Sequence, residues 1–287
     1  MIHQPEILIS KPISEQIKIH LKSEFSKLKE KARLDIVLVG NDPASQIYVK
    51  NKLLFAQSIG VMAHIHHLDP FISAKVFLQH IENLSENSET HGILIQLPIP
   101  VQLRSLDLST LIPWNKDVDG FHPYNLGRLI QNRPIFIPCT PKGIIRLMEY
   151  YQIPIKGQLI VILGRSLLVG RPLAAMLTNL HATVIQTHSK TQNTKELTKM
   201  ADIIILAIGK AKFLTADYIG NNRPYVIDVG INKDPNTGLI CGDADFEGIK
   251  PLVKGITPVP GGIGPMTVAG LGENLLLATT HQNKKLE

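Results

Sequence analysis

Apolar and polar positions divide the first part of the chain into alternating helical and extended segments. Their spacing predicts, in order, a helix over 14–31, a strand over 34–39, a helix over 44–58, a strand over 61–68, a helix over 74–86 and a strand over 92–96. This alternation is typical of a parallel sheet with helices on its faces. Ligands bind beyond the carboxyl ends of such strands, so we expect residues 40–48 and 96–98 to share one site.

The alternation resumes in the second part of the chain. The pattern predicts a strand over 159–163, a helix over 170–179, a strand over 182–187, a helix over 193–200, strands over 202–208 and 224–229, and a terminal helix from Met266 to about His281. Residues 136–143 connect the two series, with Thr140 as the expected N-cap of a helix that begins at Pro141. We therefore predict an α/β protein of two domains, an N-terminal three-layer αβα domain and a C-terminal Rossmann-like domain, with a cleft between them.

Composition supports two folded domains and narrows the possible partners. The chain has 287 residues, 44% of them hydrophobic, which is enough for two ordinary cores. No apolar run approaches the roughly 20 residues that span a bilayer, and the first residues lack a signal-peptide pattern, so we predict a cytoplasmic protein that does not bind membranes. The net charge of +6 is scattered and only 5% of residues are aromatic, which argues against nucleic acid as a partner.

Cysteine and histidine residues give no indication of a metal site. Cys139 and Cys241 are the only cysteines, and we expect both to be reduced. His64, His66 and His67 lie on a predicted strand, but no carboxylate stands at ligand spacing from them. We therefore predict no bound metal.

Tyr48 and Lys52 stand four residues apart on a predicted helix, so they share one helical face. A ring and an amine on one face can hold and act on the same substrate. In short-chain dehydrogenases a Tyr-x-x-x-Lys pair follows the glycine loop, whereas the glycine loop of this chain comes much later, which places the pair in a separate domain. A surface helix with an exposed lysine is the alternative.

Segment 116–123 is a loop, by its glycine and proline content, that carries two acids. Asp119 lies next to Gly120, and its carboxylate can accept paired hydrogen bonds from an amino-substituted heterocycle. An Asx-turn that only shapes the loop is the alternative.

The loop from Gly164 to Gly170 joins an apolar strand to a helix whose N-terminus can face a phosphate. As a dinucleotide fingerprint it is weak, because Ser166 replaces the second glycine and the last glycine comes one place late. NAD-selective sites carry an acid at the end of the second strand, but residues 187–190 contain none. Arg165 and Lys190 are positive and Ser189 can donate a hydrogen bond, so we predict NADP rather than NAD.

Segment 256–267 contains three prolines and three glycines and leads into the terminal helix. These residues allow close approach of the backbone to a ligand and fix the local shape of the chain. A purely structural turn is the alternative.

Eight segments together resemble the bifunctional methylenetetrahydrofolate dehydrogenase/methenyltetrahydrofolate cyclohydrolase family. In the order of the family they are 40–52, 92–98, 116–120, 138–143, 164–166, 188–190, 228–232 and 258–267. They extend through nearly the whole chain and are highly specific as a set. Leu167 departs from the family, which more often has a polar residue there, but this does not change the predicted cofactor.

The resemblance implies a role for each candidate site residue. Lys52 would be the central catalytic group, with Tyr48, Gln96 and Asp119 beside it. Because Gln96 is neutral, it would not stabilise an ammonium as a carboxylate would, so a desolvated Lys52 could act as a base. The residues implied to bind NADP are Gly164, Arg165, Ser166, Ser189, Ile231 and Thr140, and those implied to bind the substrate are Tyr48, Asp119, Pro260, Gly261 and Gly262.

The resemblance also implies the reactions, the domains and the assembly. The chain would oxidise 5,10-methylenetetrahydrofolate with NADP and hydrolyse the resulting methenyl compound to 10-formyltetrahydrofolate, as a homodimer. Residues 1–122 with 270–287 would form the folate-binding catalytic domain, and residues 138–269 the NADP-binding domain. Two other classes stay open, namely a dehydrogenase that uses NAD or NADP without the hydrolysis step, and a non-enzymatic nucleotide-sensing protein.

Overall fold

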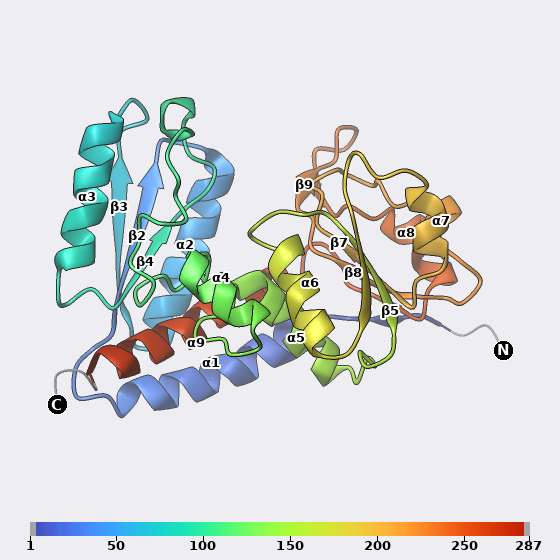
Figure 1. Ribbon diagram of the computed structural model, residues 1–287, viewed down its shortest axis with the longest axis horizontal. Helices are drawn as coiled ribbons and strands as arrows, with labels where there is room; N and C mark the ends of the chain where they lie inside the picture. Colours follow the sequence, from blue (N-terminus) through green and yellow to red (C-terminus); the bar gives the residue numbers. More distant parts are fainter. Residues whose placement is uncertain (1–3, 284–287) are drawn as a thin grey trace. The chain divides into compact units, whose positions relative to one another are not determined.

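The computed structural model describes residues 4–283, which divide into two compact units (Figure 1). The N-terminal unit contains residues 15–139 and 268–283. The C-terminal unit contains residues 4–14 and 140–267. Each unit is built around its own parallel sheet, so the predicted α/β class with two domains is confirmed.

The sheet of the N-terminal unit has strand β2 (Arg33–Val39) at its centre, between β3 (Met62–Leu68) and β4 (Gly92–Ile95). All three strands are parallel, as predicted. Helices α2 (Pro43–Ser58) and α3 (Ala74–Glu86) connect them, and α4 (Pro123–Ile130) and the short helix η1 (Val101–Leu103) follow later in the unit. The carboxyl ends of β2 and β4 therefore lie at one edge of the sheet, where Gly40 and Gln96 begin their loops.

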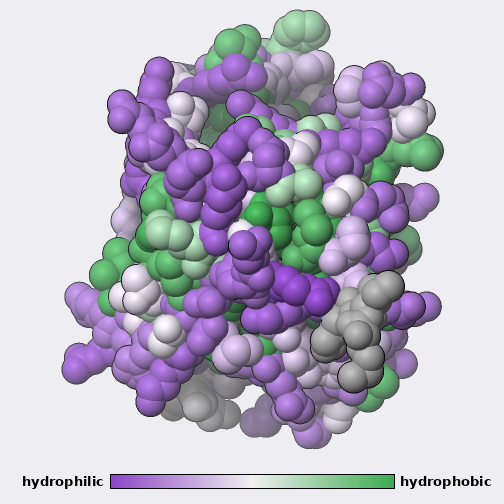
Figure 2. All heavy atoms as spheres, turned by 90° about the vertical axis from the view of Figure 1, so that its right-hand side faces the viewer, coloured by the Kyte–Doolittle hydropathy of each residue, from purple (hydrophilic) through white to green (hydrophobic). Residues whose placement is uncertain are grey.

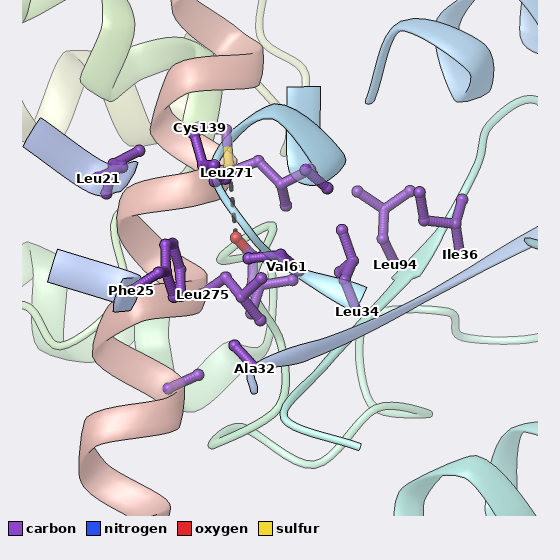
Figure 3. Packing of buried hydrophobic residues seen from close by; sticks show 14 of the residues in the cluster. Leu21, Phe25, Ala32, Leu34, Ile36, Val61, Leu94, Cys139, Leu271 and Leu275 are labelled. Atoms are coloured by element: carbon purple, nitrogen blue, oxygen red, sulfur yellow. Dashed lines mark hydrogen bonds between the residues drawn. The ribbon is translucent and has the colours of Figure 1, made fainter. Parts of the chain in front are cut away.

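Strand β2 is buried on both faces because its alternating side chains enter two different cores. Leu34 and Ile36 belong to the core that also contains residues of helices α1 (Lys11–Ser26) and α9 (Gly264–Asn283), and Ile36 lies beside Leu94 in it (Figure 3). Val37 and Val39 point to the other face and pack with Phe77 of α3. Both faces of the strand are thus covered, as is usual for a parallel sheet.

Helix α9 is the segment that returns the end of the chain to the N-terminal unit. Its Leu271 and Leu275 pack with Leu21 and Phe25 of α1 (Figure 3). Gly272 allows this close packing, because a Cβ atom there would lie 2.8 Å from a methyl group of Leu21.

Helix α1 is shifted toward the N-terminus relative to the predicted range of 14–31. It begins at Lys11 because Pro12 is tolerated in a first helical turn, where a missing N–H loses no hydrogen bond. It ends at Ser26, after which the backbone N–H of Lys27 bonds to the carbonyl of Glu24 in a tighter turn. The other predicted elements match within a few residues at their ends.

The sheet of the C-terminal unit has six parallel strands in the order β1-β11-β8-β7-β5-β6. Their bounds are β1 (Glu6–Ile7), β11 (Gly255–Ile256), β8 (Tyr225–Asp228), β7 (Ile203–Leu206), β5 (Leu159–Leu163) and β6 (Thr183–Thr187). Four of them were predicted, whereas β1 and β11 are too short to show a period. The unit also contains four α-helices, namely α5 (Cys139–Tyr150), α6 (Gly170–Asn179), α7 (Thr194–Lys199) and α8 (Phe246–Ile249). Its smaller elements are the short helices η2 (Ala216–Tyr218) and η3 (Lys250–Leu252) and an antiparallel pair of strands, β9 (Asn232–Lys233) and β10 (Ile240–Cys241).

Two local features differ from the sequence-based expectation. Residues 4–14 belong to the C-terminal unit, since Glu6 and Ile7 pair with β11, whereas residues 1–122 were expected in the N-terminal domain. Helix α5 begins at Cys139, so Thr140 lies in its first turn and is not the N-cap. The Thr140 hydroxyl lies 3.0 Å from that of Thr267.

Within residues 4–283 no helix combines the length and the apolar character needed to cross a bilayer. The face drawn in Figure 2 is mainly hydrophilic, and hydrophilic residues interrupt its hydrophobic areas. The same part of the chain contains no group of three or more His, Cys, Asp or Glu side chains that could hold a metal ion. His66 of β3 instead pairs with the buried Asp35, with Nε2 and Oδ1 2.8 Å apart.

Candidate active site

Helix α2 places Tyr48 and Lys52 one turn apart on a partly buried face. The helix starts directly after the loop that follows β2, because Asp42 caps it by accepting a hydrogen bond from the Ser45 N–H at 2.8 Å and Pro43 occupies the first turn. Val49 and Ala56 anchor the helix in the core. Tyr48 and Lys52 are half-buried. The alternative of a surface helix with an exposed lysine therefore does not describe Lys52.

Lys52 donates a hydrogen bond from Nζ to Oε1 of Gln96 at 2.9 Å. Gln96 is buried at the end of β4, and its backbone N–H bonds to the carbonyl of Val37. Its side-chain Nε2 donates to the carbonyl of Leu97 at 2.7 Å, which turns the amide oxygen toward Lys52. The lysine amine is therefore held by an uncharged acceptor.

Asp119 lies near enough to Lys52 for the two charges to interact. Burial raises the pKa of the Asp119 carboxyl above its usual value, and the charge of Asp117 adds to this effect. The positive charge of Lys52 and a hydrogen bond from Cys139 act against the rise in pKa. A half-buried carboxylate forms strong hydrogen bonds with an amino-substituted ring.

Burial also raises the pKa of the Tyr48 phenol. The ring is therefore neutral across the physiological pH range. It can stack on a flat substrate without adding a negative charge beside Lys52.

The second acid of this loop, Asp117, has a structural role. It is buried, and its carboxylate accepts hydrogen bonds from the N–H of Gly120 at 3.0 Å, the N–H of His122 at 2.7 Å and Nδ2 of Asn125 at 3.0 Å. The loop-shaping role considered for this segment thus belongs to Asp117.

Asn274 of α9 holds the backbone on both sides of the Asp119 loop. Its buried Nδ2 donates to the carbonyl of Val118 at 2.9 Å and to the carbonyl of Ile137 at 2.8 Å. Gly120 has a φ of +83°, and a Cβ there would lie 2.8 Å from the Pro138 nitrogen. Sequence reasoning missed Asn274, because nothing local marks a contact across 156 residues.

The glycine loop after β5 is shaped for close approach of its backbone to a ligand. Gly164 has a φ of +124°, and a Cβ there would overlap the carbonyl oxygen of Ala207 after β7. A Cβ on Gly170 would in turn overlap the carbonyl oxygen of Gly164. Strands β5 and β7 flank the point where the strand order reverses, which is where open α/β sheets bind nucleotides.

Ser166 and Arg165 are exposed in this loop, at the start of helix α6. The Ser166 hydroxyl accepts a hydrogen bond from the Val169 N–H at 3.1 Å, which orders the turn into the helix. In the first turn of α6 the Arg171 N–H bonds to the carbonyl of Ser166 at 3.0 Å, and Pro172 has no N–H. The two glycines thus let the backbone of the loop pack closely, in spite of the weak sequence match.

The loop after β6 lies at the same edge of the sheet. Leu163 is paired with Thr187, and the Gly164 N–H bonds to the Thr187 carbonyl at 3.0 Å. Ser189 and Lys190 follow in an exposed turn closed by a hydrogen bond from the His188 N–H to the Thr191 hydroxyl. The two adjoining loops thus carry Ser189 and the cationic side chains of Arg165 and Lys190. Residues 187–190 contain no acid.

The remaining candidate residues also lie in the C-terminal unit. Ile231 is 46% exposed and follows β8 at the carboxyl edge of the sheet. In the segment 260–262, Pro260 and Gly261 are exposed, and the Gly261 carbonyl accepts hydrogen bonds from the N–H and the hydroxyl of Ser10. Within their own units, the structure thus brings Lys52, Gln96 and Asp119 together, and places Gly164 beside the β6 turn.

Two family models together match most of the chain. Residues 8–119 match the catalytic domain of tetrahydrofolate dehydrogenase/cyclohydrolase. Residues 138–283 match the NAD(P)-binding domain of the same family.

Full-length relatives and solved structures agree with these matches. The bifunctional protein FolD of Campylobacter hominis is 44% identical over 285 residues, covering 98% of this chain and 100% of the relative. The crystal structure of the bifunctional FolD methylenetetrahydrofolate dehydrogenase/cyclohydrolase of Campylobacter jejuni superposes with a TM-score of 0.91 at 40% identity, covering 96% of this chain and 99% of that one. The Trypanosoma brucei FolD structure, complexed with NADP cofactor and inhibitor, gives a TM-score of 0.92 at 28% identity, covering 98% and 99% of the two chains.

Proposed function

The chain belongs to the tetrahydrofolate dehydrogenase/cyclohydrolase family, and we propose that it catalyses both reactions of that family. It oxidises 5,10-methylenetetrahydrofolate to 5,10-methenyltetrahydrofolate with NADP, and it hydrolyses the product to 10-formyltetrahydrofolate. The observation that carries this proposal is the amine of Lys52, held 2.9 Å from the neutral amide oxygen of Gln96 in a half-buried site with Asp119. A dehydrogenase without the hydrolysis step would not need such an amine.

In the proposed hydrolysis, Lys52 moves protons. Water adds to the methenyl carbon and loses one proton, which leaves a hydroxyl on that carbon. The bond from the carbon to one of its two nitrogens then breaks, the nitrogen takes up a proton, and the hydroxyl gives up its proton to become the formyl carbonyl, so that one proton is released overall. A lysine can accept the first proton only when it is neutral, and an amide partner positions Nζ while favouring the ammonium less than a carboxylate would. Gln96 thus acts as the group that orients Lys52.

We propose that Asp119 and Tyr48 bind the folate. The half-buried carboxylate of Asp119 accepts hydrogen bonds from the amino group and ring N–H of the pterin. Tyr48 stacks on the substrate with its neutral ring. In the C-terminal unit, Pro260, Gly261 and Gly262 are further substrate contacts in this proposal.

The proposed cofactor is NADP, which supplies the hydride acceptor for the oxidation when it is bound. The glycine loop at Gly164 and Ser166 receives the pyrophosphate at the start of α6, and Thr140 and Ile231 complete the site. Arg165 and Ser189 bind the 2′-phosphate, since these adjoining loops offer a cation and a hydroxyl where an NAD site would carry an acid.

The cellular location and the oligomeric state of the protein are two further predictions. A cytoplasmic location stays a prediction. A homodimer stays a prediction from the family, and sedimentation velocity of the purified chain would measure it.

A spectrophotometric assay with 5,10-methylenetetrahydrofolate tests the proposal. We expect reduction of NADP that is faster than reduction of NAD at equal concentrations. Added 5,10-methenyltetrahydrofolate should then disappear faster than it does in buffer alone. Oxidation without enzyme-dependent hydrolysis would indicate a dehydrogenase that lacks the hydrolysis step. The absence of both reactions would overturn the proposed function.

A further inference from the structure

Asp243 is a fully buried acid in the C-terminal unit, and it binds the loop that follows β7. Its carboxylate accepts hydrogen bonds from the backbone N–H groups of Ile208 at 2.8 Å, Gly209 at 3.1 Å and Lys210 at 2.8 Å. Three consecutive N–H groups on one carboxylate fix the backbone of this loop in a single shape.

The same carboxylate also holds the loop that follows β8. Nδ2 of Asn232 donates to Oδ1 of Asp243 at 2.8 Å. The backbone of Gly230 passes so close that a Cβ there would overlap the Asp243 carboxylate. Ile231, between these two residues, is therefore fixed in place while it remains 46% exposed.

A second buried acid, Asp228, supports Asp243 in turn. Its Oδ1 accepts a hydrogen bond from the Asp243 N–H at 3.0 Å, and its Oδ2 accepts one from the Ala244 N–H at 2.8 Å. Asp228 also accepts from the Gly230 N–H at 2.9 Å. The carboxylate of Asp228 thus fixes the backbone at Asp243 and Ala244 and the start of the loop after β8.

The two loops lie at the carboxyl edge of the sheet, next to the glycine loop. Ala207, the residue before Ile208, is the one whose carbonyl leaves no room for a side chain at Gly164. Strands β5, β7 and β8 are neighbours in the sheet, so their three loops adjoin. The loops after β7 and β8 therefore form part of the edge where the proposed nucleotide site lies.

We propose that Asp243 is a positioning residue for the nucleotide. It touches no substrate in this proposal, and it acts by holding the loops at 208–210 and 230–232 in the shape that receives NADP. This inference rests on the proposed function. It predicts that loss of the carboxylate weakens NADP binding and leaves the hydrolysis step intact, because the residues proposed to move and orient the proton, Lys52 and Gln96, belong to the N-terminal unit.

The test is the Asp243→Asn variant of the full chain, which conserves size and removes the charge. The new amide group would present donor hydrogens to backbone N–H groups that need an acceptor. We expect the KM and Kd for NADP to rise about tenfold or more, because loops that have lost this carboxylate must be ordered when the nucleotide binds. The dehydrogenase kcat at saturating NADP and the rate of methenyltetrahydrofolate hydrolysis should stay within about twofold of wild type.

Asp217→Asn is the matched control. Asp217 is also an acid of the C-terminal unit, but it is exposed and pairs with Lys195 on the surface. We expect no change in the KM for NADP, because an exposed pair of this kind contributes little. Equal thermal unfolding temperatures of wild type and Asp243→Asn in the absence of nucleotide would show that the loss is local.

A folded Asp243→Asn protein with the wild-type KM for NADP would overturn the inference. If that variant does not fold, the Asn232→Ala variant tests the inference, because it removes only the hydrogen bond between Asp243 and the side chain of Asn232. A rise of about threefold or more in the KM for NADP supports the inference, and an unchanged KM refutes it. A wild-type protein that does not bind NADP would overturn the proposed function, and this inference with it.

Discussion

The amine of Lys52 and the amide oxygen of Gln96 are 2.9 Å apart, although 44 residues separate them in the chain. Helix α2 and the end of β4 bring them together, because β2 pairs with β4 and α2 follows β2 directly. A neutral acceptor thus orients the half-buried lysine, whereas a carboxylate in the place of Gln96 would add a second negative charge to that of Asp119.

Replacing Lys52 with Met should abolish cyclohydrolase activity. Loss of a proton-transfer group costs roughly 100- to 10,000-fold in rate. The affinity for NADP should be unchanged, as measured by fluorescence titration. Lys50→Met is the control, because Lys50 is exposed on the same helix. A Lys52→Met protein that hydrolyses methenyltetrahydrofolate at the wild-type rate would refute the proposed role.

Replacing Gln96 with Glu should slow hydrolysis about tenfold or more at neutral pH, because a carboxylate at this distance favours the ammonium form of Lys52. The pH–rate profile should shift to higher pH, since Lys52 then loses its proton later. Rate measurements on methenyltetrahydrofolate across pH test this. An unshifted profile would show that Gln96 does not control the protonation of Lys52.

Replacing Asp119 with Ala should weaken folate binding by about 1.5 to 3 kcal/mol, the usual contribution of a hydrogen bond to a charged group. The KM for 5,10-methylenetetrahydrofolate should rise accordingly, with the KM for NADP unchanged. Asp107→Ala serves as the control, since Asp107 is an exposed acid of another loop in the same unit. Equal folate affinities of the two variants would contradict the assignment.

Replacing Gly164 with Ala should raise the KM for NADP about tenfold or more, because the new Cβ would push the loop away from the Ala207 carbonyl. Gly157→Ala is a matched control. Gly157 also has a positive φ, +77°, but nothing lies within 4 Å of the position of its Cβ. The control should lose about 1 kcal/mol of stability and keep its NADP affinity. Similar NADP affinities in both variants would argue against the glycine loop as the nucleotide site.

Asp228 should make the stability of the C-terminal unit depend on pH. Burial raises the pKa of this carboxyl from 3.8 to about 6, and the neighbouring charge of Asp243 adds to the rise. Between these two pH values the folded state binds more protons than the unfolded state, so the free energy of unfolding falls as pH increases. The loss is at most about 3 kcal/mol and is complete above the folded pKa.

Urea unfolding at several pH values between 4 and 7 measures this effect. The wild type should lose stability relative to Asp228→Asn as the pH increases, since the variant has no carboxyl to ionise. Parallel stability profiles for the two proteins would show that Asp228 does not titrate in this range.

The order of helices and strands, the parallel sheets and the helix that carries Tyr48 and Lys52 were predictable from sequence. These features depend on local periodicity, which burial of one face imposes on each segment. The glycine loop was also predicted, because it joins an apolar strand to a helix, and the structure shows that side chains do not fit at Gly164 and Gly170.

Only the tertiary structure decided the features that depend on contacts between distant residues. Strands β1 and β11 have two residues each and exist only because they extend the sheet formed by β8. The chain by itself did not show which of the two acids in 116–123 shapes the loop, since that depends on which carboxylate faces the backbone N–H groups. Asn274 and Asp243 carry no local signal, because their hydrogen-bond partners are far away in sequence. The sequence thus determined the segments and the chemistry available to them, and folding determined which polar side chains hold the site in place.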